Sequence, residues 1–226
     1  WGKTVGMVAS LISVDMYEAG KIRRTVSKGG DKHTVFRVGE VHGRITKRAE
    51  ELRGMVARID SAKTTTNLWG ERWSKLTVNA MRNGLCAATG LSGNQRDAAD
   101  GPRSVSIRLG AQSVRVGQAL GYSLERMLGM EPEMLALAGE GNRDALAGIE
   151  EILVEGAKKR SDEQRPSMAQ DMFKGRRTET EFINGYVAER GAYIGVPAPL
   201  HAKMNELVLR VERGDVKPSA ELIAGW

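Results

Sequence analysis

Lys75, Asn79 and Asn83 follow one another at spacings of four residues, inside the run from Trp69 to Gly90. Four residues advance an α-helix by about 400° and about 6 Å, so each side chain lies about 40° around from the one before. The spacing therefore predicts one ammonium and two carboxamides on a narrow stripe of one helix. The flanks of that helix are apolar, which leaves the stripe facing either a cleft or water.

The chemistry that this trio offers is the stabilisation of a developing oxyanion. The Lys75 ammonium is a compact cation that attracts negative charge and can release a proton to it. The amides of Asn79 and Asn83 offer donors and acceptors to a hydroxyl or a carboxylate. The alternative is a solvated face, on which the lysine ends in water and the asparagines bond to neighbouring side chains or to solvent.

Two further polar residues, Ser167 and Glu179, stand where helices are predicted to begin. Ser167-x-x-Gln170 and Thr178-x-x-Glu181 both have the form of a capping box, which predicts a helix start at each. A helix N-terminus presents free N–H groups and the positive end of its dipole, so Ser167 also lies where a substrate carboxylate would be favoured.

Together these segments resemble the C-terminal helical domain of the ketopantoate reductase (2-dehydropantoate 2-reductase) family. The family pattern Lys-Leu-x-x-Asn-x-x-x-Asn stands at 75–83, Ser-Met-x-x-Asp at 167–171, and Thr-Glu-x-(Asp/Glu)-(Tyr/Phe)-Ile-Asn-Gly at 178–185. They occur in the family's order. The stretch 195–199 is similar to the Gly-x-x-x-Pro before the family's last helix. The resemblance covers about 68–213.

The resemblance implies NADPH-dependent reduction of 2-dehydropantoate to pantoate, a step towards pantothenate and coenzyme A. It implies Lys75 as the proton donor to the keto oxygen, and Asn79 and Asn83 as substrate-binding residues. A further substrate-binding asparagine usually follows in the next loop of the family. Asn94 is the candidate here, although its spacing is off by one residue.

For the second pair of segments, the resemblance implies that Ser167 binds substrate. It implies that Glu179 contacts the nicotinamide ribose and lies near the lysine, as a catalytic and cofactor-binding residue. Asp171 and Asn184 belong to the same motifs, but their residue types suggest no specific chemistry. We interpret both as structural.

The Gly-x-Gly-x-x-Gly sequence that holds a dinucleotide pyrophosphate is absent from these 226 residues. The segment 139–144 comes nearest, but it lacks the third glycine and follows no strand. We therefore expect residues 1–66 to be the C-terminal part of a Rossmann-like nucleotide-binding domain, and residues 67–226 a helical substrate and catalytic domain. The expected fold class is α+β, mostly α.

Composition bounds the remaining choices. The chain has 41% hydrophobic and 27% charged residues, as a globular protein does. The net charge of +6 is spread out in short basic groups interleaved with acids, which argues against nucleic-acid binding. Cys86 is the single cysteine, and we expect an inert core thiol in a cytoplasmic protein. The uncharged stretch 4–14 is too short to span a membrane, and we interpret it as a buried strand.

The first part of the chain carries three β-branched runs, 7–17, 21–28 and 33–41. The turn signals Ala19-Gly20 and Gly29-Gly30-Asp31 between them predict antiparallel hairpins. Apolar residues at helical spacing predict an amphipathic helix over 44–60 that packs on this sheet. The sheet would have an exposed edge, which favours association, and a homodimer is possible.

Helical patterns dominate after residue 67. The threonines and asparagine of 64–67 are N-cap candidates for the helix with the polar stripe, and Gly90 is its predicted stop. Further helices are predicted at 102–120, 132–138, 143–159, 167–172, 179–193 and 199–212. We interpret the segment 121–165 as an additional helical pair, with its methionines, including Met127, Met130 and Met134, as core residues.

No histidine has a Cys, Asp or Glu partner at metal-ligand spacing, so we expect no metal site. The sequence thus favours a 2-keto acid reductase. Two alternatives stay open: a reductase of another 2-keto acid on the same scaffold, and a non-catalytic helical oligomerisation module.

Overall fold

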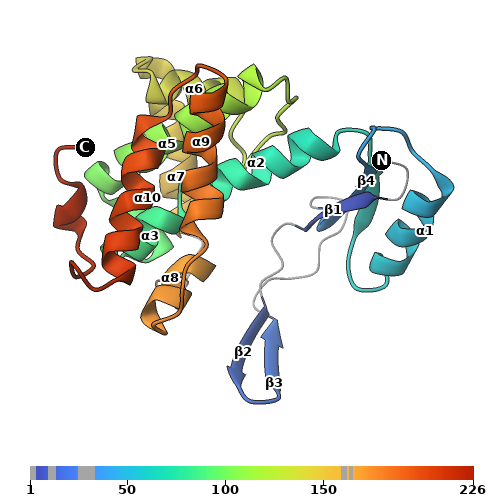
Figure 1. Ribbon diagram of the computed structural model, residues 1–226, viewed down its shortest axis with the longest axis horizontal. Coiled ribbons are helices and arrows are strands. Elements are labelled where there is room, and N and C mark those ends of the chain that lie inside the picture. Colours follow the sequence, from blue (N-terminus) through green and yellow to red (C-terminus); the bar gives the residue numbers. More distant parts are fainter. Residues whose placement is uncertain (1–3, 10–13, 25–33, 159–161, 163–164) are drawn as a thin grey trace. The chain divides into compact units, whose positions relative to one another are not determined.

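The structure is a computed structural model that describes residues 4–9, 14–24, 34–158, 162 and 165–226 (Figure 1). The chain divides into two compact units, Trp1–Lys75 and Leu76–Trp226. The boundary falls inside helix α2, Leu68–Ala80. The first unit contains the strands and the second is helical, which confirms the α+β, mostly α class. The division expected after residue 66 stays a prediction.

The first unit contains a three-stranded sheet and a two-stranded hairpin. The sheet has the order β1-β4-β5, with β1 antiparallel to β4 and β5 parallel to β4. The hairpin joins β2 to β3 through Ala19 and Gly20, and the positive φ of 77° at Gly20 suits a tight turn. The strands are β1 Val5–Ala9, β2 Val14–Glu18, β3 Lys21–Arg24, β4 Phe36–Glu40 and β5 Ala62–Thr65.

Three expectations about these strands change. The run 7–17 holds parts of two strands, β1 and β2, rather than one. The strand expected to be buried over 4–14 is short, and only Val8 of β1 is buried, because β1 is an edge strand of its sheet. Strand β5 was not predicted, since its threonines look like helix caps in sequence. The turn predicted at 29–31 lies outside the described residues, whereas the Ala19-Gly20 hairpin is confirmed.

Two glycines of the sheet leave room for the first residue of α2. Gly6 of β1 and Gly39 of β4 are register partners. A Cβ on Gly6 would lie 2.6 Å from the Leu68 side chain, and one on Gly39 would lie 3.1 Å from the Leu68 Cβ. Leu68 is 2% exposed. The absence of two side chains therefore makes the space in which Leu68 anchors the first turn of α2.

Helix α1, Lys47–Val56, covers the sheet within the first unit, as predicted, but is shorter than expected. Its N-cap Thr46 accepts from the N–H of Ala49. Glu40, at the end of β4, is buried and accepts from Arg48 Nε at 2.7 Å and from Thr46. The hydrogen bond from Arg48 is the main cause that lowers the pKa of Glu40 to about 2. This ion pair, in which only Glu40 is buried, joins the helix start to the sheet.

The second unit is built around α5, which packs against α4, α6, α9 and α10. Figure 1 shows α9 and α10 side by side, and α8 packs against α3. The elements are α3 Asn83–Thr89, α4 Gly93–Ala98, α5 Asp100–Ala119, α6 Pro132–Gly139, α7 Arg143–Lys158, α8 Ser167–Phe173, the π-helix η1 Glu181–Gly185, α9 Tyr186–Tyr193, α10 Pro199–Glu212 and the 3-10 turn η2 Ala220–Ile223.

The additional helical pair is formed by α6 and α7, with α6 against α5. Met127 and Met130 are buried, which confirms them as core residues, and Met134 is half-buried. Arg115 of α5 binds two carboxylates of α6 and the residue after it, Glu133 at 2.8 Å and Glu140 at 2.5 Å. Of the helices that the structure describes, none is long and apolar enough to cross a membrane.

Candidate active site

The helix expected to carry the whole polar stripe is broken. Helix α2 ends at Ala80 and α3 begins at Asn83, with a turn at Met81 and Arg82 between them. The expectation of one helix with three polar residues on one stripe is therefore wrong. Lys75 and Asn79 are on α2, whereas Asn83 starts the next helix. The predicted stop at Gly90 is confirmed, since Gly90 is the C-cap of α3 with a φ of 75°.

The break leaves backbone carbonyls without partners in the helix, and side chains from distant elements donate hydrogen bonds to them. Ser106 of α5 donates to the carbonyl of Met81 at 2.9 Å, and Asn184 of η1 donates to the carbonyl of Ala80 at 2.8 Å. Both side chains are fully buried. Helix ends leave carbonyls without intrahelical partners, and burial requires that they be bonded. The break is therefore a built feature of the second unit.

Lys75 is the last residue of the first unit and lies in α2. Its ammonium donates to the carbonyl of Ala9, the last residue of β1. The residue as a whole is exposed, but the surroundings of the ammonium remove part of its water, and this burial lowers the pKa of Lys75 below its ordinary value of 10.5. A lysine with a lowered pKa gives up its proton more readily.

Asn79 and Asn83 lie in the second unit with their amides available. Asn79 is half-buried, and Asn83 is 7% exposed. Among the described residues, neither amide makes a side-chain hydrogen bond. Most buried polar side chains are bonded to protein or to water, so a buried asparagine without a protein partner is a candidate for binding a ligand.

Ser167 and Glu179 are brought together. Ser167 Oγ lies 3.4 Å from Glu179 Oε1, within the hydrogen-bonding limit but at its long end, and both residues are exposed. The capping box expected at Ser167 is wrong: Pro166 is the N-cap of α8, and Gln170 Nε2 donates to the carbonyl of Arg165. The Ser167 hydroxyl is therefore free of a capping role and directed at a carboxylate.

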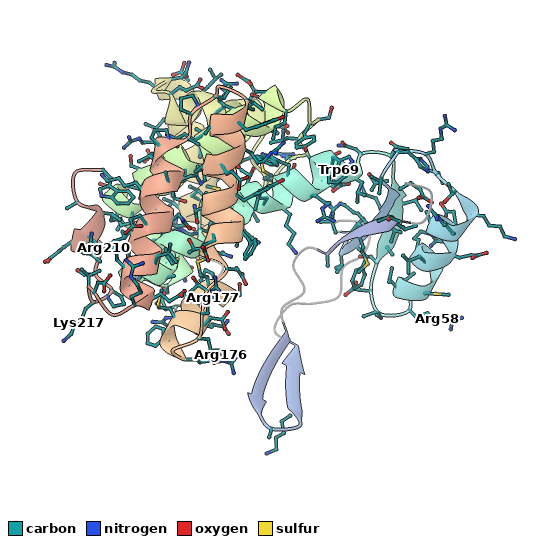
Figure 2. The ribbon with its side chains drawn as sticks, in the orientation of Figure 1. Arg58, Trp69, Arg176, Arg177, Arg210 and Lys217 are labelled. Carbon is teal, nitrogen blue, oxygen red and sulfur yellow. The ribbon has the colours of Figure 1, made fainter. Side chains whose placement is uncertain are left out.

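The second capping box is also wrong. Thr178 donates its N–H and its hydroxyl to Glu212 Oε2, each at 2.7 Å, and Glu181 binds Arg177 at 2.7 Å. Glu212 is the last residue of α10, so a tertiary contact replaces the local cap. Arg177, which Figure 2 labels, lies in the sequence between the end of α8 and the start of η1. The turn that carries Glu179 is thus held by α10.

Asn184, which we interpreted from the sequence as structural, bonds two distant elements. Besides the bond to Ala80, its Nδ2 lies 3.0 Å from His201 Nδ1, and His201 Nε2 lies 2.8 Å from the carbonyl of Leu109. The Asn184 amide nitrogen only donates, so His201 Nδ1 accepts and Nε2 carries the proton given to Leu109. Burial lowers the pKa of His201 to about 4, which keeps this tautomer neutral.

Asn94 and Asp171 have partners of their own. Asn94, on α4, donates to Asp162 at 2.9 Å. Asp171 lies in α8, where its carbonyl accepts from the N–H of Arg176 and its carboxylate lies 3.8 Å from the guanidinium of the same residue. Asp171 therefore stabilises the end of α8, in keeping with a structural role.

A buried charged pair in α4 was not predicted. Arg96 and Asp97 are both fully buried, and their side chains lie 2.6 Å apart. Arg96 also donates to the thiol of Cys86. Cys86 is buried, as expected, and burial raises the pKa of its thiol. Arginine and aspartate are mostly exposed in proteins, so no sequence signal marks this pair as buried.

The described residues also include a pocket, and their possible metal ligands do not form a metal-binding group. A pocket of about 250 Å³ lies between α3, α8 and the chain near Pro218, and its lining is apolar apart from Cys86. Within the described part of the chain, no group of three or more His, Cys, Asp or Glu residues could hold a metal ion. Asn83 and the pair formed by Ser167 and Glu179 are polar groups of the same unit.

Residues 67–212 match the family model of the ketopantoate reductase PanE/ApbA C-terminal domain. This chain belongs to the ketopantoate reductase family. The matched range contains α2, the break, the contact between Ser167 and Glu179, and α10.

One curated relative carries the family's name, and solved structures share the fold. A 2-dehydropantoate 2-reductase of Archaeoglobus fulgidus is 26% identical over 182 residues, which cover 78% of this chain and 52% of that protein. A dimeric ketopantoate reductase from Staphylococcus aureus has a TM-score of 0.67 and 15% identity, over 94% of this chain and 63% of that one. D-mandelate dehydrogenase in complex with NADH has a TM-score of 0.68 and 17% identity, over 92% of this chain and 63% of that one. The chain spans about half the length of the curated relative.

Proposed function

We propose that this chain is part of a reductase that converts a 2-keto acid to a 2-hydroxy acid, with 2-dehydropantoate as the substrate and pantoate as the product. The observation that carries the proposal is the buried Asn83, whose amide makes no side-chain hydrogen bond among the described residues. The contact between Ser167 and Glu179 in the same unit adds a hydroxyl and a carboxylate. Membership of the ketopantoate reductase family supports the choice of reaction.

In this proposal Asn79, Asn83 and Ser167 bind the substrate. Amide and hydroxyl donors are suited to the carboxylate and the hydroxyl groups of a 2-keto acid. Asn83 is buried, so a hydrogen bond from it is made in surroundings with little water, where it is stronger. Asn94 keeps its predicted role only as a minor candidate, because its amide is already bonded to Asp162.

Lys75 is the proposed proton donor. As negative charge develops on the keto oxygen, the ammonium stabilises it and transfers a proton. The lowered pKa of Lys75 favours that transfer. Its present partner is the carbonyl of Ala9, which orients the ammonium without neutralising it.

The cofactor is proposed to be NADPH, which supplies a hydride to the carbonyl carbon when bound. The exposed carboxylate of Glu179 fits the ribose hydroxyls at the nicotinamide end, because a carboxylate accepts two hydrogen bonds readily. The D-mandelate dehydrogenase with the same fold was solved with NADH, so rates with NADPH and NADH need to be compared. A lower KM for NADH than for NADPH would contradict the choice of NADPH.

The experiment that tests the reaction replaces Lys75 in the complete protein that contains this chain. We expect Lys75→Ala to reduce kcat with 2-dehydropantoate by orders of magnitude, with little change in NADPH affinity. Lys47→Ala, an exposed lysine of α1, is the matched control. A kcat for Lys75→Ala within tenfold of the parent would contradict the assignment.

A second candidate is a reductase of another 2-keto acid, favoured by the fold shared with D-mandelate dehydrogenase. Comparing kcat/KM for 2-dehydropantoate and for the aryl keto acid that corresponds to mandelate separates the two. If neither keto acid is reduced by the complete protein, the alternative of a non-catalytic helical module gains support. We also propose a homodimer, by analogy with the dimeric Staphylococcus aureus enzyme, and sedimentation of the complete protein measures this directly.

A further inference from the structure

Asn184 occupies a position from which it reaches both segments that carry proposed site residues. It lies in the π-helix η1, which begins two residues after Glu179. Its amide donates to the carbonyl of Ala80, three residues before Asn83 and 104 residues away in sequence. Asn184 is fully buried. It therefore joins the break that precedes Asn83 to the segment that follows Glu179.

The second amide hydrogen fixes the orientation of the side chain. It is donated to His201 of α10, and His201 in turn donates to the carbonyl of Leu109 in α5. Rotating the amide by half a turn would place its oxygen against the carbonyl of Ala80, and two acceptors repel. Asn184 is thereby locked between α2, α5 and α10.

The oxygen of the Asn184 amide lies where a side chain on Gly84 would be. A Cβ on Gly84, the residue after Asn83, would lie 2.6 Å from Asn184 Oδ1. Real Cβ atoms do not approach an oxygen so closely, so this position requires glycine while Asn184 stays in place. Asn184 thus touches the chain on both sides of Asn83, at Ala80 and at Gly84.

We propose that Asn184 is a positioning residue that sets the place of the Asn83 amide relative to Glu179. The inference rests on the proposed function, because it matters only if Asn83 binds substrate. An aspartate could not replace Asn184, since an ionised carboxylate has no hydrogen to donate to Ala80 or to His201. An alanine would leave the buried carbonyl of Ala80 without a partner and release the break.

The test is a double-mutant cycle on the KM for 2-dehydropantoate, measured with the complete protein. We expect Asn83→Ala and Asn184→Ala each to raise KM about tenfold, the loss that accompanies one substrate hydrogen bond. In the Asn83→Ala background, Asn184→Ala should add less than about twofold, because its effect passes through Asn83. Effects that multiply to about a hundredfold would overturn the proposal.

Controls separate positioning from general loss of structure. Asn205→Ala removes an amide of α10 that also packs against η1, near Gly185, and should leave KM unchanged. If Asn184→Ala does not fold by circular dichroism, Asn184→Ser, which keeps one donor, replaces it in the cycle. If Asn83→Ala leaves KM unchanged, the proposed function of Asn83 fails. If Asn83→Ala raises KM and Asn184→Ala does not, only the positioning role fails.

Discussion

Acid should destabilise the second unit through His201. Its imidazole is fully buried between neutral partners, Asn184 and Leu109, and burial lowers its pKa from 6.5 to about 4. Because the folded pKa lies below the unfolded one, the neutral form stabilises the fold above pH 6.5, and this stability is lost as the pH falls towards 4. At about 1.4 kcal/mol per pKa unit, the loss between pH 7 and pH 5 is about 2 kcal/mol.

Two measurements on the 226-residue chain check this value. NMR titration of the imidazole resonances gives the pKa directly, and His201→Gln assigns the signal among the three histidines. Urea unfolding at pH 7 and at pH 5 gives the loss of stability, which His201→Gln should reduce by about 2 kcal/mol. His42→Gln, on the surface of the first unit, controls for the removal of an imidazole. A His201 pKa of 6 or above would refute the reasoning.

Two further predictions concern the same unit, and a third concerns the whole chain. Gly84→Ala should lower the free energy of unfolding, measured by urea unfolding, by about 1–3 kcal/mol, because the added Cβ meets Asn184. Gly156→Ala in α7 is the control, since its Cβ would have open space around it, and it should be neutral or stabilising. Equal effects of the two variants would contradict the packing. Ser167→Ala should raise the KM for the keto acid by roughly twofold to tenfold; a rise only in the KM for NADPH would assign Ser167 to the other ligand. In calorimetry the 226-residue chain should bind NADPH very weakly, because it lacks the Gly-rich phosphate turn, and a micromolar complex would contradict this.

Much of the second unit could be predicted because the signals are local. Helix α10 has the predicted bounds, 199–212, and α5 to α8 differ from expectation by at most two residues at either end. Apolar residues repeat with the helical period, and prolines mark the starts of α6 and α10. The motifs around Lys75, Ser167 and Glu179 could likewise be recognised as residue patterns, and the family match bears out the resemblance.

The break between α2 and α3 could not be predicted, because its causes are far away in the sequence. Periodicity continues across Met81 and Arg82, and only Ser106 and Asn184 reveal that the carbonyls there are bonded elsewhere. The two capping boxes failed for the same reason: Glu212 and Glu179 offer tertiary partners to Thr178 and Ser167.

The sequence by itself determined the helical character of the second unit and which polar residues are candidates for chemistry. Only the tertiary structure decided that Asn83 begins a new helix, that Ser167 meets Glu179, and that Asn184 joins the two segments. The physical reason is that helix periodicity is a property of neighbouring residues. A buried donor, by contrast, takes whichever acceptor the folded chain brings to it, and that choice is made only when the distant elements pack.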